Sequence, residues 1–174
     1  MQCCLTMIWR AMKINFEELN KIICDSVKQE DQGHWFTLEP FSPEGLHGFV
    51  YSIYNQPDDK YYIGKKNFFH GGKKNYKRNG IKVPNYRYGT QTNWKSYTGS
   101  SAELNLDMAK HGKENFLFTI LRLYETRGGL SYGEANIQHK LDVLTMKGDN
   151  DEAKFYNGNI AAIKYIPKEI GRSP

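Results

Sequence analysis

Apolar residues stand at helical spacing near the start of the chain and then give way to strand-like runs. Between residues 16 and 30 the apolar side chains recur every three or four positions, which is the period of one helix face. Asn15 is a residue type that caps helix N-termini, and Glu17 and Glu18 suit the positive end of a helix dipole. This pattern predicts a helix over residues 16–30 that packs on a sheet. Residues 31–47 predict a connector that contains one short strand.

Residues 48–66 carry the pattern of a β-hairpin. The first half is β-branched and aromatic, residues 55–59 are dense in turn formers, and a second short strand ends at Gly64. Tyr51 and Tyr62 belong to different strands of this hairpin. A tight hairpin therefore brings the two phenol side chains into one neighbourhood.

The middle of the chain predicts a turn-rich segment, a helix and a buried strand. Residues 67–97 contain several glycine-bearing turn pairs and are not expected to hold a long helix. Ser100 and Glu103 have the spacing of a capping box and predict a helix that ends before Gly112. Residues 116–121 form a near-continuous apolar run, which is typical of a strand buried on both faces.

A third helix and a closing segment complete the predicted order. Ser131 is expected to cap a helix that continues to about Met146, since apolar residues recur there at helical spacing. Residues 155–166 are expected to close the domain. The order of helix, two strands, basic loop, helix, strand, helix and closing segment predicts an α+β fold.

The chain length and the apolar pattern limit the classes of protein to consider. The chain has 174 residues, which is enough for one compact domain. No apolar run approaches the roughly 20 residues that span a bilayer, so no membrane partner is expected. The first residues lack a basic segment and a small-residue cleavage site, so they are expected to make a poor signal peptide. We expect residues 1–11 to be an upstream extension outside the fold, ahead of a more natural beginning at Met12.

The cysteines indicate a reducing compartment. Cys3, Cys4 and Cys24 form no C-x-x-C pair and have no histidine at a spacing suited to zinc. An odd number of cysteines without a disulfide framework argues against disulfides and structural zinc. We therefore expect a cytoplasmic protein.

The net charge of +5 comes from one segment. Residues 60–102 carry ten lysine and arginine residues and no Asp or Glu, and aromatic residues are interleaved with these cations. Cations neutralise phosphates and rings stack on bases, so the segment predicts a nucleic-acid-facing loop. The alternative is a solvated basic loop whose rings anchor it to the domain. The candidate nucleic-acid contacts are Lys65, Lys73, Lys74, Lys77, Arg78, Arg87 and Lys95.

Several short motifs follow one another in order along the chain. The hairpin reads Phe49-Val50-Tyr51 on one strand and Tyr62-Ile63-Gly64 on the other, with Gly48 displaced by one position from a Gly-Ile-Tyr motif. The later landmarks are Tyr97-Thr98-Gly99-Ser100-Ser101, Lys110-His111-Gly112, Asn115-Phe116, Ser131-Tyr132-Gly133-Glu134-Ala135 and Tyr156-Asn157. Together they resemble the GIY-YIG endonuclease superfamily, and in particular its phage-encoded, homing-type members.

The resemblance implies a small antiparallel three-stranded sheet flanked by helices, with a long basic loop insertion. It implies a nuclease domain over residues 48–166, in which residues 67–97 form the basic, aromatic-rich insertion. Residues 1–47 would be an N-terminal extension and helix, and residues 167–174 a tail.

The resemblance also implies the chemistry of the site. Glu134 would hold one divalent ion, Mg²⁺ with Mn²⁺ as an alternative, because hard cations prefer carboxylate and water ligands. Tyr51 and Tyr62 would line the attacking water and the phosphate, one of them orienting or deprotonating the nucleophile, and Tyr51 is the one we expect to touch the water. Asn157 would support the backbone of the site.

The chain departs from the superfamily at one cation. Members usually carry an arginine on a helix about eight residues after the Tyr-Ile-Gly motif, where this chain has Gly71-Gly72-Lys73-Lys74. We expect Lys66 to stabilise the charge that develops on the phosphate. The alternatives are Lys65, Arg78 and Arg87.

Structural explanations exist for several of these residues. Glu134 has capping-box spacing from Ser131, and two tyrosines in a hairpin are unremarkable in a chain with twelve. His111 suits a helix C-terminus, where a cation interacts well with the dipole. His70 and His139 could approach the site, although neither spacing is diagnostic.

The sequence therefore predicts a metal-dependent DNA endonuclease, encoded by a phage or mobile element. One alternative is a non-catalytic DNA- or RNA-binding module on the same fold. Another is a repair or restriction nuclease. Monomer and homodimer both remain open.

Overall fold

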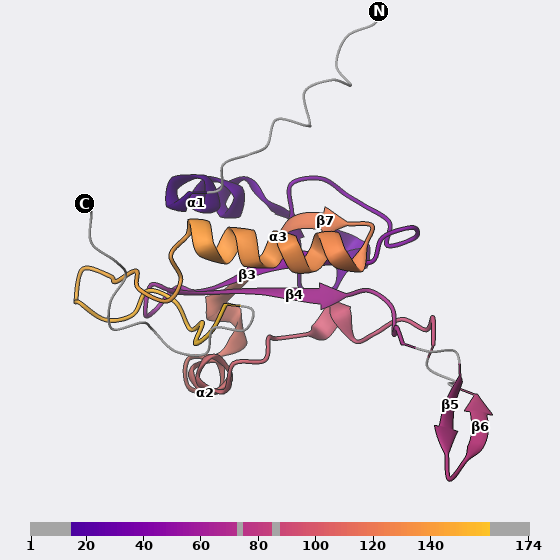
Figure 1. Cartoon of the computed structure of the whole chain (residues 1–174). Coiled ribbons are helices and arrows are strands. Elements are labelled where there is room, and N and C mark those ends of the chain that lie inside the picture. The colour runs from indigo at the N-terminus through magenta and orange to yellow at the C-terminus, as the bar shows by residue number, and fades with distance from the viewer. Residues whose placement is uncertain (1–14, 73–74, 85–87, 161–174) are drawn as a thin grey trace, which may run out of the picture.

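The hairpin predicted for residues 48–66 forms two adjacent strands of a larger sheet (Figure 1). The computed structural model describes residues 15–72, 75–84 and 88–160. β3 (Gly48–Asn55) pairs antiparallel with β4 (Lys60–Asn67). The other side of β3 pairs antiparallel with β7 (Phe116–Tyr124), with a register shift between Val50 and Tyr51. β3 is therefore an inner strand. Both predicted strands of the hairpin are confirmed, although β4 continues to Asn67 instead of ending at Gly64 as expected.

The sheet has five strands in mixed orientation, so the expected three-stranded antiparallel sheet is wrong. β1 (Val27–Lys28) and β2 (Phe36–Thr37) extend it to the order β1-β2-β7-β3-β4, and β2 runs parallel to β7. Each added strand is only two residues long. A strand of two residues is too short to display an alternating pattern, and β1 falls within the range that was predicted to be helical. β2 is the one short strand that was expected within the connector.

The first helix is shorter than predicted. α1 (Phe16–Asp25) begins as expected, with the Asn15 side chain accepting a hydrogen bond from the Glu18 amide at 2.8 Å. It ends because Ser26 takes an extended conformation and donates its hydroxyl hydrogen bond to the Ile22 carbonyl at 2.6 Å. The chain then enters β1 and a 3-10 turn, η1 (Glu30–Gln32).

The other two helices differ from the prediction in their caps. α2 (Ala102–His111) is capped by Ser101, whose hydroxyl accepts from the Leu104 amide, and the expected cap Ser100 lies one position earlier. α3 (Arg127–Lys140) is capped by Thr126, so Ser131 lies inside the helix. α3 ends at Lys140 instead of Met146. The first turn of α3 contains Gly128 and Gly129, which are poor helix formers, so the sequence did not predict that the helix begins there.

The helices cover the two faces of the sheet. α1 and α3 lie on one face and α2 on the other (Figure 1). The side chains of adjacent strand residues point to opposite faces, so Tyr61 and Tyr62 belong to different layers of the core. The core on the α1–α3 face includes Leu19, Ile22, Val50, Ile63, Leu130 and Ile137. The core on the α2 face includes Trp35, Phe49, Tyr51, Phe68, Trp94 and Leu104.

The closing segment covers the outer edge of β4. The Tyr61 amide donates to the Lys154 carbonyl at 2.9 Å, and the Tyr156 amide donates to the Tyr61 carbonyl at 2.8 Å. Tyr61 and Phe155 form an isolated parallel bridge. This segment therefore satisfies backbone groups that an edge strand would otherwise leave exposed.

The basic insertion contains a second, two-stranded sheet. β5 (Asn75–Arg78) and β6 (Ile81–Pro84) form a hairpin that projects from the body of the domain (Figure 1). The insertion returns through a 3-10 turn, η2 (Trp94–Ser96), and a similar turn, η3 (Lys113–Asn115), precedes β7. The described part of residues 67–97 contains no α-helix, as predicted. Predictions for residues 1–11, Lys73, Lys74, Arg87 and the tail at 167–174 lie outside the described residues.

Among the helices of the described ranges, none has the length and apolar character that a bilayer-crossing segment needs.

Candidate functional site

A groove of about 510 Å³ lies beside the β4 edge, between the closing segment, the start of α2 and α3. We call it the β4-edge groove, and its lining residues are Tyr62, Ser100, Ser101, Glu134, Gln138, Tyr156, Asn157, Gly158 and Asn159. Tyr62 reaches it from the α2 face of the sheet. Glu134 and Gln138 reach it from α3 on the opposite face. Side chains from both faces of the sheet therefore line the groove, because it lies at the edge of the sheet.

Tyr51 lies beside Tyr62 on the α2 face of the sheet, and it does not itself line the groove. Its side chain is only 1% exposed, and its ring centroid is 6.1 Å from that of Tyr62. A β-carbon on Gly64 would come within 2.5 Å of the Tyr51 hydroxyl oxygen. The glycine of the Tyr-Ile-Gly motif is therefore required because the Tyr51 ring occupies the space of a side chain.

The Tyr51 hydroxyl is held in its protonated form. Burial raises the pKa of Tyr51 well above its ordinary value, and the nearby Tyr62, Tyr97 and Glu134 raise this pKa further. Burial also raises the pKa of Tyr62, although its hydrogen bond with Ser100 opposes that shift. Both phenols therefore keep their protons at neutral pH, and neither is a ready base.

Ser100 has a partner other than the helix it was expected to cap. Its hydroxyl and that of Tyr62 share a hydrogen bond of 3.0 Å. Because Ser101 caps α2, Ser100 remains available to hold the Tyr62 ring at the groove. The sequence contained two adjacent serines, and nothing in their spacing showed which of them was the cap.

Glu134 forms an ion pair with Lys65. The Lys65 Nζ lies 2.8 Å from a carboxylate oxygen of Glu134 and donates to the Ser131 hydroxyl at 3.2 Å. The Glu134 side chain is 21% exposed, so its carboxylate is accessible from the groove. The spacing of Ser131 and Glu134, which resembled a capping box, instead places both on the helix face that meets Lys65.

A close contact sets α3 against the sheet beside Glu134. A β-carbon on Gly133 would collide with the Tyr124 ring and hydroxyl at the end of β7. The contact is with the tip of the Tyr124 side chain, so a larger residue at position 133 would have to displace that ring or the helix. Gly133 and the Tyr124 ring therefore pack directly against each other, one residue from Glu134.

Asn157 and Gln138 bind the backbone of Ile63 at the groove floor. The Asn157 side chain accepts from the Ile63 amide at 2.9 Å and donates to the Ile63 carbonyl at 2.7 Å. Gln138 donates to the same carbonyl at 3.0 Å. These bonds tie the closing segment and α3 to the middle of the Tyr-Ile-Gly motif. Gln138 was missed from the sequence, although it stands four residues after Glu134 on the same helix face.

Lys66 points to the face opposite Lys65. Its Nζ donates to the Asn93 side chain at 2.9 Å and lies 3.9 Å from the centroid of the Tyr97 ring. Burial lowers the pKa of Lys66. Tyr97 in turn packs edge-on against Tyr51, with ring centroids 6.2 Å apart. Lys66 is therefore linked to the tyrosines through Tyr97, whereas Lys65 is the lysine in contact with Glu134.

The other candidate cations within the described ranges do not line the β4-edge groove. Lys77 and Arg78 belong to β5, and Lys95 is exposed on η2. His70 lines a separate hollow together with Lys65 and Lys66. His139 is exposed in the last turn of α3 and does not line the β4-edge groove.

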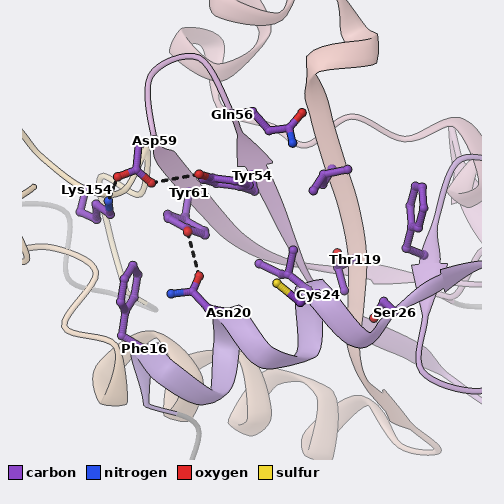
Figure 2. A pocket seen from close by; sticks show the side chains of 13 residues that line it. Phe16, Asn20, Cys24, Ser26, Tyr54, Gln56, Asp59, Tyr61, Thr119 and Lys154 are labelled. Carbon is purple, nitrogen blue, oxygen red and sulfur yellow. Dashed lines mark hydrogen bonds and ion pairs between the residues drawn. The ribbon is translucent and has the colours of Figure 1, made fainter.

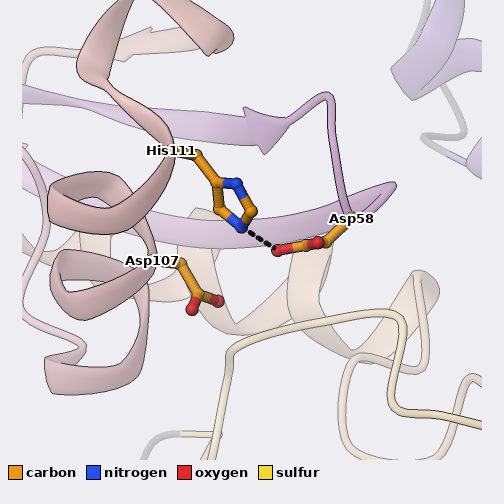
Figure 3. Close-up of side chains that lie close together, drawn as sticks. All are labelled: Asp58, Asp107 and His111. Carbon is orange, nitrogen blue, oxygen red and sulfur yellow. Dashed lines mark ion pairs between the residues drawn. The ribbon is translucent and has the colours of Figure 1, made fainter.

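Asp58, Asp107 and His111 form a further cluster of groups that could hold a cation (Figure 3). One ligand atom from each lies within 4.8 Å of the others, and His111 Nε2 is 3.0 Å from Asp58. Two of these groups already have other partners, because Asn55 donates to Asp58 at 2.9 Å and the Tyr156 hydroxyl donates to Asp107 at 2.8 Å. No sequence pattern predicted the cluster, since Asp58 comes from the hairpin turn and the others from α2.

A larger pocket of about 640 Å³ lies between α1 and the sheet (Figure 2). Tyr54, Tyr61 and Thr119 line it, with Asn20 and Cys24 from α1. It opens on the face opposite Tyr51 and Tyr62. Its walls share none of the residues of the β4-edge groove.

One family of proteins matches most of this chain. Residues 32–160 match the family described as putative endonuclease segE, GIY-YIG domain. No curated protein and no solved structure matches. The matched range runs from η1 to the end of the described chain, and it includes every residue of the β4-edge groove. The chain therefore belongs to the GIY-YIG endonuclease superfamily, in the family described as putative endonuclease segE.

Proposed function

We propose that this protein is a divalent-metal-dependent endonuclease that hydrolyses phosphodiester bonds in DNA. One observation carries the proposal: Glu134 and Tyr62 line the same groove, and the Tyr51 ring packs beside that of Tyr62, with centroids 6.1 Å apart. A carboxylate beside two phenol donors suits a site that binds a cation, a water and a phosphate together. Membership in an endonuclease family supports the same conclusion.

The groove suits a hard divalent ion held by one carboxylate. Mg²⁺ keeps several of its waters and needs only one or two carboxylates from the protein, and Mn²⁺ accepts similar ligands. Glu134 is a partly exposed carboxylate at a groove with room for those waters, and its one ion-pair partner among the described residues is Lys65. When bound, the ion would lower the pKa of a bound water and neutralise charge on the phosphate.

The two tyrosines would act as hydrogen-bond donors. Because the pKa of Tyr51 is raised, its hydroxyl would orient the attacking water, and we assign it no role as a base. Tyr62, held by Ser100, would contact the phosphate. Asn157 would keep the Ile63 backbone in place beneath both.

Two lysines could stabilise the charge that develops on the phosphate. Lys66 remains the first candidate on the tyrosine face, where Tyr97 and Asn93 hold its ammonium group. Lys65 is the alternative, because DNA binding could draw it from Glu134 toward a phosphate oxygen. The cleavage rates of the Lys65→Ala and Lys66→Ala variants, measured at saturating DNA, separate these roles.

The DNA would lie across the acid-free segment at residues 60–102. Ten positive charges without a carboxylate give this segment a field that attracts phosphates. The proposed contacts are Lys65, Lys73, Lys74, Lys77, Arg78, Arg87 and Lys95. A phage or mobile-element origin and a homing role belong to this proposal, as does a cytoplasmic location.

Cleavage of supercoiled plasmid tests the function. We expect nicking or linearisation with Mg²⁺ and none with EDTA, and we expect both Glu134→Gln and Tyr51→Phe to lose cleavage while retaining DNA binding. Glu125→Gln, an exposed carboxylate in the loop before α3, is the matched control and should cleave normally. Cleavage by Glu134→Gln at the wild-type rate would contradict the proposal.

A non-catalytic binding module is the second candidate. The ion pair between Lys65 and Glu134 favours this candidate, because a glutamate paired with a lysine can have a purely structural role. Salt-sensitive DNA binding without cleavage of plasmid or phage genomic DNA would support this module. If cleavage occurs, a panel of linear, branched and modified duplexes separates a homing enzyme from a repair or restriction enzyme.

A further inference from the structure

The β5–β6 hairpin, which we call the basic ribbon (residues 75–84), projects from the domain as a separate two-stranded sheet. Asn79 and Gly80 form its turn, with φ values of 50° and 80°. Left-handed backbone at both turn positions is the geometry of a tight type I′ hairpin turn, which matches the natural twist of two strands. The ribbon is thus a well-formed element, although it does not pair with the main sheet.

The register of the ribbon divides its charges between two faces. Lys77 lies opposite Lys82, and Arg78 lies opposite Ile81. Directly opposed residues share a face of a two-stranded sheet, so one face carries two lysines and the other an arginine beside an isoleucine. Two like charges directly opposite each other destabilise a hairpin unless an anion lies between them. Among the described residues no carboxylate forms an ion pair with either lysine.

Ile81 is the second unusual feature of the ribbon. It is 69% exposed at the end of the hairpin, beside the turn. A β-branched residue there has no core to pack against. In DNA, however, the thymine methyl group offers an apolar contact in the major groove, and Arg forms a bidentate hydrogen bond to guanine in the same groove.

We propose that the basic ribbon enters the major groove of duplex DNA, with Arg78 and Ile81 directed at base edges and Lys77 and Lys82 at phosphates. Two strands about 4.8 Å apart fit a groove about 12 Å wide, which admits a β-ribbon. Four residues per strand, at roughly 3.3 Å each, give about 13 Å of ribbon to insert. Lys82 thereby joins the expected DNA contacts, and Arg78 and Ile81 are the residues that would distinguish one base pair from another.

This inference rests on the proposed DNA substrate, and binding in EDTA tests it apart from cleavage. The probes are four 40-base-pair duplexes of the same mixed sequence, bound by the full chain and followed by fluorescence anisotropy. One is unmodified. The others carry 7-deazaguanine for guanine, deoxyuridine for thymidine, or inosine for guanine, which remove a major-groove acceptor, the major-groove methyl group and the minor-groove amine respectively.

We expect the first two replacements to weaken wild-type binding about 5-fold or more and the inosine duplex to bind like the unmodified one. Arg78→Ala should no longer distinguish 7-deazaguanine from guanine, and Ile81→Ala should no longer distinguish deoxyuridine from thymidine. Lys77→Ala and Lys82→Ala should each lower the slope of log affinity against log salt by about 0.9 on every duplex. Lys21→Ala, an exposed lysine on α1, is the charge control and should change neither quantity.

Three results would overturn the inference. Wild-type binding could be insensitive to both major-groove replacements, it could be weakened only by inosine, or the ribbon variants could bind with unchanged affinity and salt slope. Circular dichroism of each variant excludes unfolding as the cause of a loss. If wild type cleaves while the ribbon variants bind normally, only this inference fails. If the ribbon binds as expected but no duplex is cut with Mg²⁺, only the proposed function fails.

Discussion

The hydroxyl of Tyr51 lies over Gly64, where a β-carbon would come within 2.5 Å of its oxygen. Tyr51 and Gly64 are directly paired across β3 and β4, so the ring of one occupies the side-chain space of the other. This relationship explains why the two halves of the hairpin motif depend on each other. It also brings the buried phenol of an inner strand close to the sheet edge at which Glu134 lies.

Replacing Gly64 by alanine should therefore displace Tyr51. We expect Gly64→Ala to lower the free energy of unfolding by about 1–3 kcal/mol, because the added methyl overpacks a filled space. A shift of about 1 Å at Tyr51 should also lower the rate of plasmid nicking roughly 100-fold. Urea unfolding and initial nicking rates measure the two effects. Gly71→Ala is the matched control, since a β-carbon there meets nothing within 4 Å, and an equal loss in both variants would contradict the argument.

Lys65 should compete with the proposed divalent ion for Glu134. Its ammonium group lies 2.8 Å from the carboxylate and is partly exposed, and pairs of this kind contribute up to about 1 kcal/mol. We expect Lys65→Met to bind Mn²⁺ about 2- to 5-fold more tightly by calorimetry in the absence of DNA. Lys66→Met should leave that affinity unchanged, because its ammonium contacts Asn93 and Tyr97 instead. Weaker Mn²⁺ binding by Lys65→Met would show that this lysine does not oppose the metal.

Asn157 should stabilise the fold through Ile63. It satisfies both backbone groups of that residue, and Gln138 shares only the carbonyl. Asn157→Ala should therefore leave the Ile63 amide without its partner and cost about 1–3 kcal/mol in urea unfolding. Asn159→Ala removes an exposed amide of the same segment and should change stability little. Equal urea midpoints for the two variants would show that Asn157 does not stabilise the fold through Ile63.

His34 should make the fold less stable in mild acid. Burial, followed by the charge of Lys113, lowers the pKa of His34 from 6.5 to about 4, while its hydrogen bond to the Tyr97 carbonyl opposes the shift. The unfolded chain therefore binds a proton more readily than the folded chain between these two pH values. The contribution of His34 to stability is complete above about pH 6.5 and is lost as the pH falls toward 4.

Thermal unfolding at several pH values checks this prediction. The melting temperature of the wild type should fall between pH 6.5 and 4, and His34→Gln should show a shallower fall over the same range. His139→Gln, which replaces an exposed histidine, should follow the wild-type curve. A His34→Gln curve parallel to that of the wild type would mean that other groups govern the acid response.

The sequence alone determined the parts of this protein that local patterns encode. Alternation and turn chemistry predicted the hairpin around Tyr51 and Tyr62, and helical spacing predicted the three helices. The matched family confirms the superfamily that the ordered motifs indicated. These features depend on residues that are close in sequence, so that backbone preference and periodicity reveal them.

Only the tertiary structure decided how those parts meet. β1 and β2 are too short to have a pattern, so the five-stranded sheet emerged only from their pairing. Ser100, Gln138 and Asn157 reach the β4-edge groove from three separate segments, and Lys65 rather than Lys66 meets Glu134 because adjacent strand residues face opposite ways. Contacts between distant segments depend on register and packing, which no local stretch of sequence specifies.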